Sequence, residues 1–201
     1  MRDRFDFFYT LFYFLVFPFF NLVHPCRVIG REHIPQGGVL ICCNHTTLAD
    51  PLMLCFVFPL KCRLRVMAKA ELLSVPVVGA LVKSAGVFGV ERGKSDITAI
   101  KTAIKYLKDG RKVLMFPEGT RSKDGTLGQA KTGAAMLAVK TGVPVLPVYL
   151  PPVKKLFRPT TAVIGEPYYP FTGEGKAGAD EYQAMADEMM KKIGALKEKA
   201  V

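Results

Sequence analysis

The sequence has few of the side chains that form covalent catalytic centres or zinc sites. Serine is scarce and no GxSxG motif occurs, so nothing indicates the exposed serine nucleophile of many hydrolases. No CxxC pair is present either. The five cysteines are odd in number and unpatterned: Cys26, Cys42, Cys43, Cys55 and Cys62. Such a set predicts reduced, mostly buried thiols in a protein that faces the cytosol.

Two groupings of these residues still deserve a test. Cys42, Cys43 and His45 are close in sequence, but neighbouring side chains of a strand point to opposite faces, so we expect no bound metal. Cys43 and His45 would share one face, which permits a Cys–His nucleophilic pair. A cysteine inside the apolar run LICC is more often a core residue.

Acidic residues are also in short supply. The 201 residues include 28 Lys and Arg against 17 Asp and Glu, which gives a net charge of +11 and a pI near 9.5. Such a surface favours nucleic acid, an anionic bilayer or phosphorylated small molecules. No nucleic-acid-binding signature is recognisable, and the aromatic residues gather near the N-terminus instead of among the basic ones. We therefore expect no nucleic-acid partner.

The first 25 residues are strongly apolar. The run from 7 to 23 is marginal for a full bilayer span, and Pro18 interrupts it. A cleaved signal peptide fits poorly, because no small-residue cleavage site follows. A buried core helix is the alternative. We expect residues 1–30 to be a membrane anchor that lies in one leaflet or spans once.

Residues 31–201 are expected to form one α/β domain, because no internal repeat or long linker divides them. Apolar runs predict strands at 38–43, 63–68, 85–90, 112–116, 143–150 and, less clearly, 160–166. Helices are predicted at 51–59, 70–84 (broken), 95–110 with Ser95 as N-cap, 130–142 and 180–198. This alternation predicts a mostly parallel central sheet flanked by helices.

Polar clusters follow three of these strands: NHTTLAD at 44–50, ERG at 91–93 and PEGTRS at 117–122. Ligands of such sheets bind at the carboxyl ends of the strands, so the three clusters predict a single site.

His45 and Asp50 allow two interpretations. Asp50 precedes Pro51, a favoured pair for the start of a helix, so it could simply be an N-cap. The turn between strand and helix could also fold its carboxylate onto the imidazole, which would fix the tautomer of a general base. Both readings can hold at once.

Basic residues at strand ends predict phosphate binding. Arg121 offers a planar fork for phosphate, and Gly119 lets the backbone approach closely. Arg92 ends another strand and Lys131 opens a helix. A solvated loop is the alternative for each of them.

Four blocks in this order resemble the 1-acylglycerol-3-phosphate (lysophosphatidate) acyltransferases of the phospholipid/glycerol acyltransferase superfamily. NHTTLAD is similar to their NHxxxxD motif, and GVFGVER, FPEGTRS and VPVLPV are similar to the next three blocks. One departure is Val90-Glu91, where many members read closer to IDR.

The resemblance implies that His45 deprotonates the sn-2 hydroxyl of lysophosphatidic acid and that Asp50 orients it. Acyl transfer from acyl-CoA or an acyl carrier protein thioester would be direct and give phosphatidic acid, with no acyl-enzyme, bound cofactor or metal. The residues that would bind the acceptor and its phosphate are Arg92, Glu118, Gly119, Thr120, Arg121 and Ser122, with Lys69 and Lys131 as further candidates.

The same resemblance implies a place at the cytoplasmic face of the cell membrane, on an anionic bilayer. Another acceptor remains the nearest alternative: glycerol-3-phosphate, another lysophospholipid or an acylated amino-acid lipid. A lipid or thioester hydrolase and a non-catalytic anion-binding module are the others.

Overall fold

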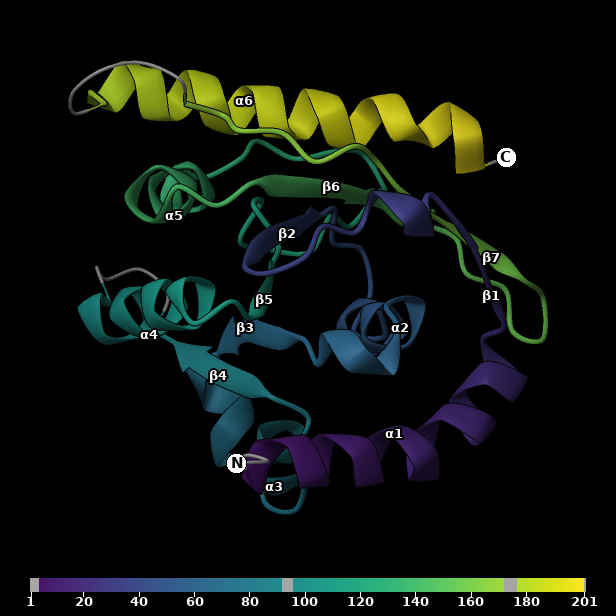
Figure 1. Cartoon of the computed structure of the whole chain (residues 1–201). Coiled ribbons are helices and arrows are strands. Elements are labelled where there is room, and N and C mark those ends of the chain that lie inside the picture. The colour runs from purple at the N-terminus through teal and green to yellow at the C-terminus, as the bar shows by residue number, and fades with distance from the viewer. Residues whose placement is uncertain (1–3, 92–95, 172–176, 201) are drawn as a thin grey trace.

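A seven-stranded sheet organises the chain in the computed structural model, which describes residues 4–91, 96–171 and 177–200 (Figure 1). The strands are β1 (Cys26–Ile29), β2 (Val39–Cys43), β3 (Arg65–Lys69), β4 (Val87–Val90), β5 (Lys112–Met115), β6 (Val145–Tyr149) and β7 (Thr160–Ile164). Their order in the sheet is β1-β7-β6-β2-β5-β3-β4, and every pair is parallel except β6 with β7. The predicted α/β fold with a mostly parallel sheet is confirmed.

Helices cover both faces of this sheet. They are α1 (Arg4–Val23), α2 (Asp50–Val57), α3 (Val78–Ser84), α4 (Ile97–Lys108), α5 (Gly133–Thr141) and α6 (Ala179–Ala195). Short 3-10 turns lie at Arg31–His33, Leu60–Cys62, Ala70–Ser74 and Leu196–Ala200. The segment 70–84 is indeed broken, into a 3-10 turn and α3.

Alternation along the central strand β2 divides the core into two layers. Leu40 and Cys42 pack with α4, α5 and α6 on one face, whereas Ile41 and Cys43 pack with α2 on the other (Figure 1). All five residues of β2 are buried, as expected for a parallel strand covered on both faces. Cys42 and Cys43 therefore point to opposite faces.

Helix α1 lies on the far side of the domain from α6 (Figure 1). One stripe of it packs around Phe56 of α2, with ring centroids of Tyr13, Phe17 and Phe20 5.1–5.3 Å from their nearest aromatic partners. Near its N-terminal end, Asp6 forms ion pairs with Arg63 (3.5 Å) and Arg111 (3.4 Å). The helix is thus docked along the domain through one face.

Two local features differ from expectation. Strand β1 was not predicted, because its four residues form too short a run for their alternation between half-buried and exposed to stand out in the sequence. It pairs with β7 at the edge of the sheet. The N-cap of α4 is Asp96, whose carboxylate accepts the Ala99 N–H at 2.9 Å. Ser95, the predicted cap, lies outside the described residues.

Candidate active site

Three loops meet at the carboxyl edge of the sheet, because β2 pairs with β5 on one side and with β6 on the other. They are the segments 44–49 after β2, 116–132 after β5 and 150–159 after β6. Asn44 fastens the first to the last: its amide donates to the Leu150 carbonyl (2.8 Å) and accepts the Leu150 N–H (2.9 Å). Two of the three predicted clusters therefore come together. In the third, Glu91 is described, whereas Arg92 and Gly93 lie outside the described residues.

His45 and Asp50 are in direct contact. The Nδ1 atom of His45 lies 3.0 Å from Oδ2 of Asp50, and both side chains are buried. Because Oδ2 is a carboxylate oxygen, Nδ1 carries the hydrogen and donates it, which leaves Nε2 as the free acceptor of the ring. The pair therefore has the geometry of a histidine base oriented by a carboxylate.

Asp50 does not cap α2, so that part of the prediction is wrong. Its carboxylate turns back to the preceding loop and accepts the backbone N–H groups of Thr46 (2.7 Å) and Thr47 (2.8 Å). The Thr47 hydroxyl donates to the other oxygen at 2.6 Å. These bonds fold residues 45–50 into a turn, and the turn brings the carboxylate to the imidazole.

A buried lysine that sequence reasoning missed completes this cluster. The Nζ atom of Lys154 lies 2.8 Å from Oδ1 of Asp50, and only 3% of the lysine side chain is exposed. Burial alone would raise the pKa of Asp50, but hydrogen bonds from His45, Lys154 and Thr47 and the charge of Lys154 outweigh it, so the pKa lies below its ordinary value. Asp50 is therefore ionised. The only available signal was the pair of lysines at 154–155, two residues after the prolines that follow β6.

The backbone and ring of His45 are held by the loop after β5. Its N–H donates to Oε1 of Glu118 (3.1 Å), its carbonyl accepts the Ser122 N–H (2.8 Å), and its ring stacks on Phe116 at 4.0 Å between centroids. The other Glu118 oxygen faces the Gly128 N–H at 3.4 Å. Glu118, predicted to bind the acceptor, therefore contacts the backbone of His45 in this structure.

Cys43 has no features of a nucleophile. It is fully buried, and burial together with the charge of Asp50 raises its pKa well above the ordinary value. The thiol form is therefore favoured, which makes a Cys43–His45 pair a poor candidate. Among residues 4–91, 96–171 and 177–200, no three His, Cys, Asp or Glu side chains are grouped so as to hold a metal ion.

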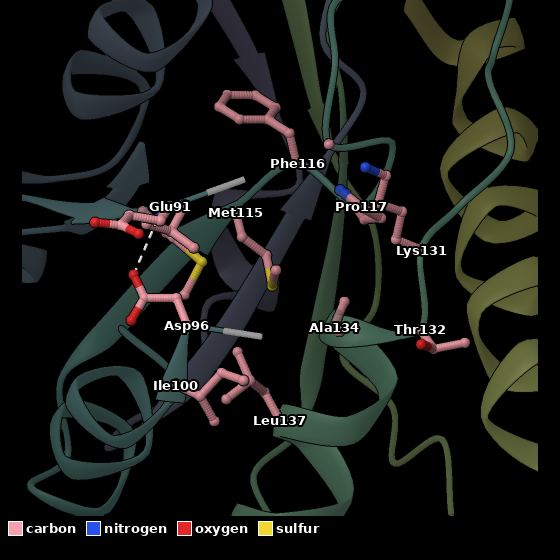
Figure 2. A pocket seen from close by; sticks show the side chains of 14 residues that line it. Glu91, Asp96, Ile100, Met115, Phe116, Pro117, Lys131, Thr132, Ala134 and Leu137 are labelled. Carbon is pink, nitrogen blue, oxygen red and sulfur yellow. Dashed lines mark hydrogen bonds between the residues drawn. The ribbon is translucent and has the colours of Figure 1, made fainter. Parts of the chain in front are cut away.

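An apolar cavity of about 420 Å³ opens beside the His45–Asp50 pair (Figure 2). One end is at Phe116, the residue that stacks on His45, and the other lies between Ile100 of α4 and Leu137 of α5. Met115 projects into it from β5, and Glu91 and Asp96 stand at one side. Gly119 and Lys131, two predicted site residues, line the same cavity. The positive φ of Gly119 (69°) disfavours any other residue at position 119, and a Cβ there would also crowd the Lys131 side chain at 3.0 Å.

A second, open hollow of about 500 Å³ is polar. Its lining consists of Thr46, Thr120, Arg121, Ser122 and Lys123. Three predicted acceptor-binding residues thus lie next to the loop of His45 and Asp50, and Lys123 joins them. Lys69 ends β3 instead, and its Nζ forms an ion pair with Glu71 at 2.9 Å.

Comparison with known proteins identifies the family. The profile of the Acyltransferase family matches residues 25–151, which include the first two loops and only residues 150 and 151 of the third. The chain belongs to the Acyltransferase family. Its matched region begins at the residue before β1 and contains His45, Asp50 and Glu118.

Individual members of the Acyltransferase family are similar over different lengths. A 1-acyl-sn-glycerol-3-phosphate acyltransferase of Borreliella burgdorferi is 38% identical over 61% of this chain, but the match spans only half of that protein. One of Bacillus subtilis is 31% identical over 86% of this chain and 88% of its own. The crystal structure of a 1-acyl-sn-glycerophosphate (LPA) acyltransferase, PlsC, from Thermotoga maritima superposes with a TM-score of 0.65 at 31% identity, covering this whole chain and 85% of that one.

Proposed function

We propose that the protein is a membrane-associated acyltransferase that moves a fatty acyl group from a thioester to the sn-2 hydroxyl of lysophosphatidic acid, giving phosphatidic acid for phospholipid synthesis. The observation that carries the proposal is the buried His45–Asp50 contact at 3.0 Å beside an apolar cavity. The names of the relatives support the acceptor, since those of Borreliella burgdorferi and Bacillus subtilis are both 1-acyl-sn-glycerol-3-phosphate acyltransferases.

In this mechanism Nε2 of His45 takes the proton of the acceptor hydroxyl as its oxygen attacks the thioester carbonyl. Asp50 holds the ring through Nδ1 and stabilises the imidazolium that forms. The tetrahedral intermediate then collapses, the carbon–sulfur bond breaks, and the imidazolium returns its proton to the leaving thiolate. The acyl group passes directly from sulfur to oxygen.

The polar hollow is the proposed site of the acceptor phosphate. Arg121 can bind two phosphate oxygens through its planar guanidinium, and Lys123 adds a second positive charge. Thr46 lines the same hollow and follows His45 directly, so a phosphate held there brings the sn-2 hydroxyl of the short glycerol backbone close to the base. Arg92 remains a predicted phosphate ligand.

The apolar cavity is the proposed site of the donor's acyl chain. Its lining includes the apolar side chains of Met67, Val90, Ile100, Met115, Ala134 and Leu137, and Phe116 joins its end to the imidazole of His45. An acyl chain in this cavity therefore places the thioester carbonyl near the base. The donor itself is an acyl-CoA or an acyl carrier protein thioester.

We propose further that α1 holds this site at the cytoplasmic face of an anionic cell membrane. Asp6–Val23 is long and apolar enough to cross a bilayer, with a mean hydropathy of 1.5. Its inner face already packs on α2, whereas Phe14 and Phe19 of the outer face are 64% and 75% exposed. A helix with only one face free for lipid fits a position in one leaflet. The exposed Phe157 lies beside its C-terminal end, because the Phe157 N–H donates to the Val23 carbonyl at 2.7 Å.

An acyl-transfer assay with the purified protein tests the reaction. Acyl-CoA and acyl carrier protein thioesters are each supplied with lysophosphatidic acid, glycerol-3-phosphate or a neutral lysolipid, and product is measured by mass spectrometry. We expect acceptor-dependent transfer to lysophosphatidic acid and its loss in His45→Ala with an unchanged circular dichroism spectrum. Thioester consumption without an acceptor would indicate a hydrolase, and full activity of the variant would refute His45 as the base.

Vesicle sedimentation tests the membrane. Replacing Phe14 and Phe19 by Ser removes two exposed aromatic side chains, each worth about 1.5–3 kcal/mol when buried in lipid. We expect the double variant to release the protein from phosphatidylglycerol vesicles. Replacing two residues of the exposed face of α6, Glu181 and Lys191, is the control and leaves sedimentation unchanged.

A further inference from the structure

We propose that Lys154 is a positioning residue of the catalytic centre, whose charge keeps Asp50 ionised and the His45–Asp50 pair ready to accept a proton. The inference rests on the proposed function, because it takes His45 as the base. It starts from the 2.8 Å ion pair between Nζ and Oδ1 of Asp50. Lys154 lies in the loop after β6, outside the four sequence blocks that resemble the acyltransferase family.

The lysine is held so completely that it has no free hydrogen for a substrate. Besides Asp50, its Nζ donates to the Thr46 hydroxyl at 2.9 Å and to the Pro151 carbonyl at 2.7 Å. Three acceptors use all three ammonium hydrogens, and the side chain is 3% exposed. Lys154 therefore acts on the reaction through Asp50 and not by touching a substrate.

Asp50 needs a counter-charge because it is entirely buried. Five groups in the described part of the chain lie within 3.0 Å of its oxygens: His45 Nδ1, the N–H groups of Thr46 and Thr47, the Thr47 hydroxyl and Lys154 Nζ. Of these five, the Lys154 ammonium alone carries a charge throughout the reaction. A buried carboxylate without such a partner tends to take up a proton.

The charge also acts on the pair as a whole. A cation next to Asp50 disfavours protonation of the carboxylate, and it disfavours a positive imidazole on the other side of that carboxylate. Both effects lower the pH at which the His45–Asp50 pair takes up a further proton, whether the imidazole or the carboxylate holds it. Among the described residues, two other titratable groups face the cluster: Glu118 from the loop after β5, whose charge acts in the opposite direction, and the neutral Cys43 thiol of β2. Neither replaces the lysine.

The pH dependence of kcat/KM tests the proposal. The acidic limb of wild-type protein is compared with that of Lys154→Met, with Lys154→Arg and with Lys155→Met, which removes the same charge from the exposed neighbouring residue. We expect the acidic limb of Lys154→Met to move to higher pH by about 1 unit or more. At a pH on that limb, kcat/KM of the variant is then ~10-fold lower than that of the wild type. Lys154→Arg should restore the wild-type limb, and Lys155→Met should leave it in place.

A purely structural lysine would lower the amount of active protein without moving the limb, and that result would overturn the proposal. If Lys154→Met does not fold, the double variant Lys154→Met/Asp50→Asn decides, because it removes both charges together. Recovery of folded protein supports charge pairing, and failure of the double variant to fold refutes it. Failure of the proposed function is distinct: there His45→Ala would be active, or the wild-type profile would have no acidic limb.

Discussion

The apolar cavity offers the sharpest test, through the substitution Gly133→Leu. Gly133 lines the cavity at the first residue of α5, and a Cβ built on it meets no heavy atom within 4 Å. The new side chain can therefore extend into the space proposed for the acyl chain without displacing backbone. Because Gly is replaced by a better helix former, the fold should be at least as stable as before.

The expected loss follows from the number of methylene groups that the leucine excludes. Its four carbons displace about four methylenes, each worth about 0.8 kcal/mol of apolar burial, or ~3 kcal/mol together. That free energy is a loss of ~200-fold in kcat/KM for donors long enough to reach α5, and Gly133→Ala should cost ~4-fold. Short donors that do not reach Gly133 should react at the wild-type rate.

The assay is a series of purified acyl-CoA donors from octanoyl to octadecanoyl, with lysophosphatidic acid held constant and thermal unfolding measured beside it. The signature is a loss of kcat/KM that begins at one chain length, grows over about four further carbons and is constant for longer donors. An equal loss for every donor, with unchanged thermal stability, would show that the cavity does not hold the acyl chain and would refute the reasoning.

Three further predictions concern the frame of the site. Asp50→Asn should lower the free energy of unfolding by about 3–5 kcal/mol at pH 7, because it leaves the buried Lys154 charge unpaired. Because the pKa of Asp50 is lowered in the folded state, the ionised carboxylate stabilises the fold at any pH above the ordinary carboxyl pKa. Urea titrations should therefore show the difference in free energy of unfolding between the wild type and Asp50→Asn becoming smaller as the pH falls below about 4. Glu118→Gln should keep most of kcat, because the amide oxygen still accepts the His45 N–H, whereas Glu118→Ala should lose most of kcat. If the KM for lysophosphatidic acid instead rises equally in the two variants, Glu118 binds the substrate. Phe56→Ala should expose α1 to limited proteolysis, because four aromatic rings of α1 surround that side chain, and an unchanged cleavage rate would contradict the packing.

The sequence predicted the sheet because its central strands are buried on both faces and give unbroken apolar runs, as in β2 and β6. It also placed the polar clusters at one edge, since parallel strands share that edge. What it missed depends on contacts between residues far apart in the chain. Nothing near Lys154 in the sequence shows that its ammonium reaches Asp50, and the two are joined only when β6 pairs with β2.

The error at Asp50 has a different origin. Asp before Pro is a common way to begin a helix, and local statistics favour a cap. Here the N–H groups of Thr46 and Thr47, together with the lysine, bind the carboxylate on the side away from the helix. Local preference yields to a tertiary network that only the folded chain provides.

The bond between Asn44 and Leu150 has a consequence for synthesis of the protein. The two residues are 106 positions apart, and the amide of one holds the backbone of the other at the end of the central strands. A nascent chain that has not yet exposed residue 150 lacks this pair of bonds, and one that has not yet exposed residue 154 also lacks the counter-charge of Asp50. The contacts around His45 and Asp50 are therefore complete only after residue 154 has left the ribosome, although α1 is synthesised before them. Under the proposed function, chains that end before residue 154 would be inactive.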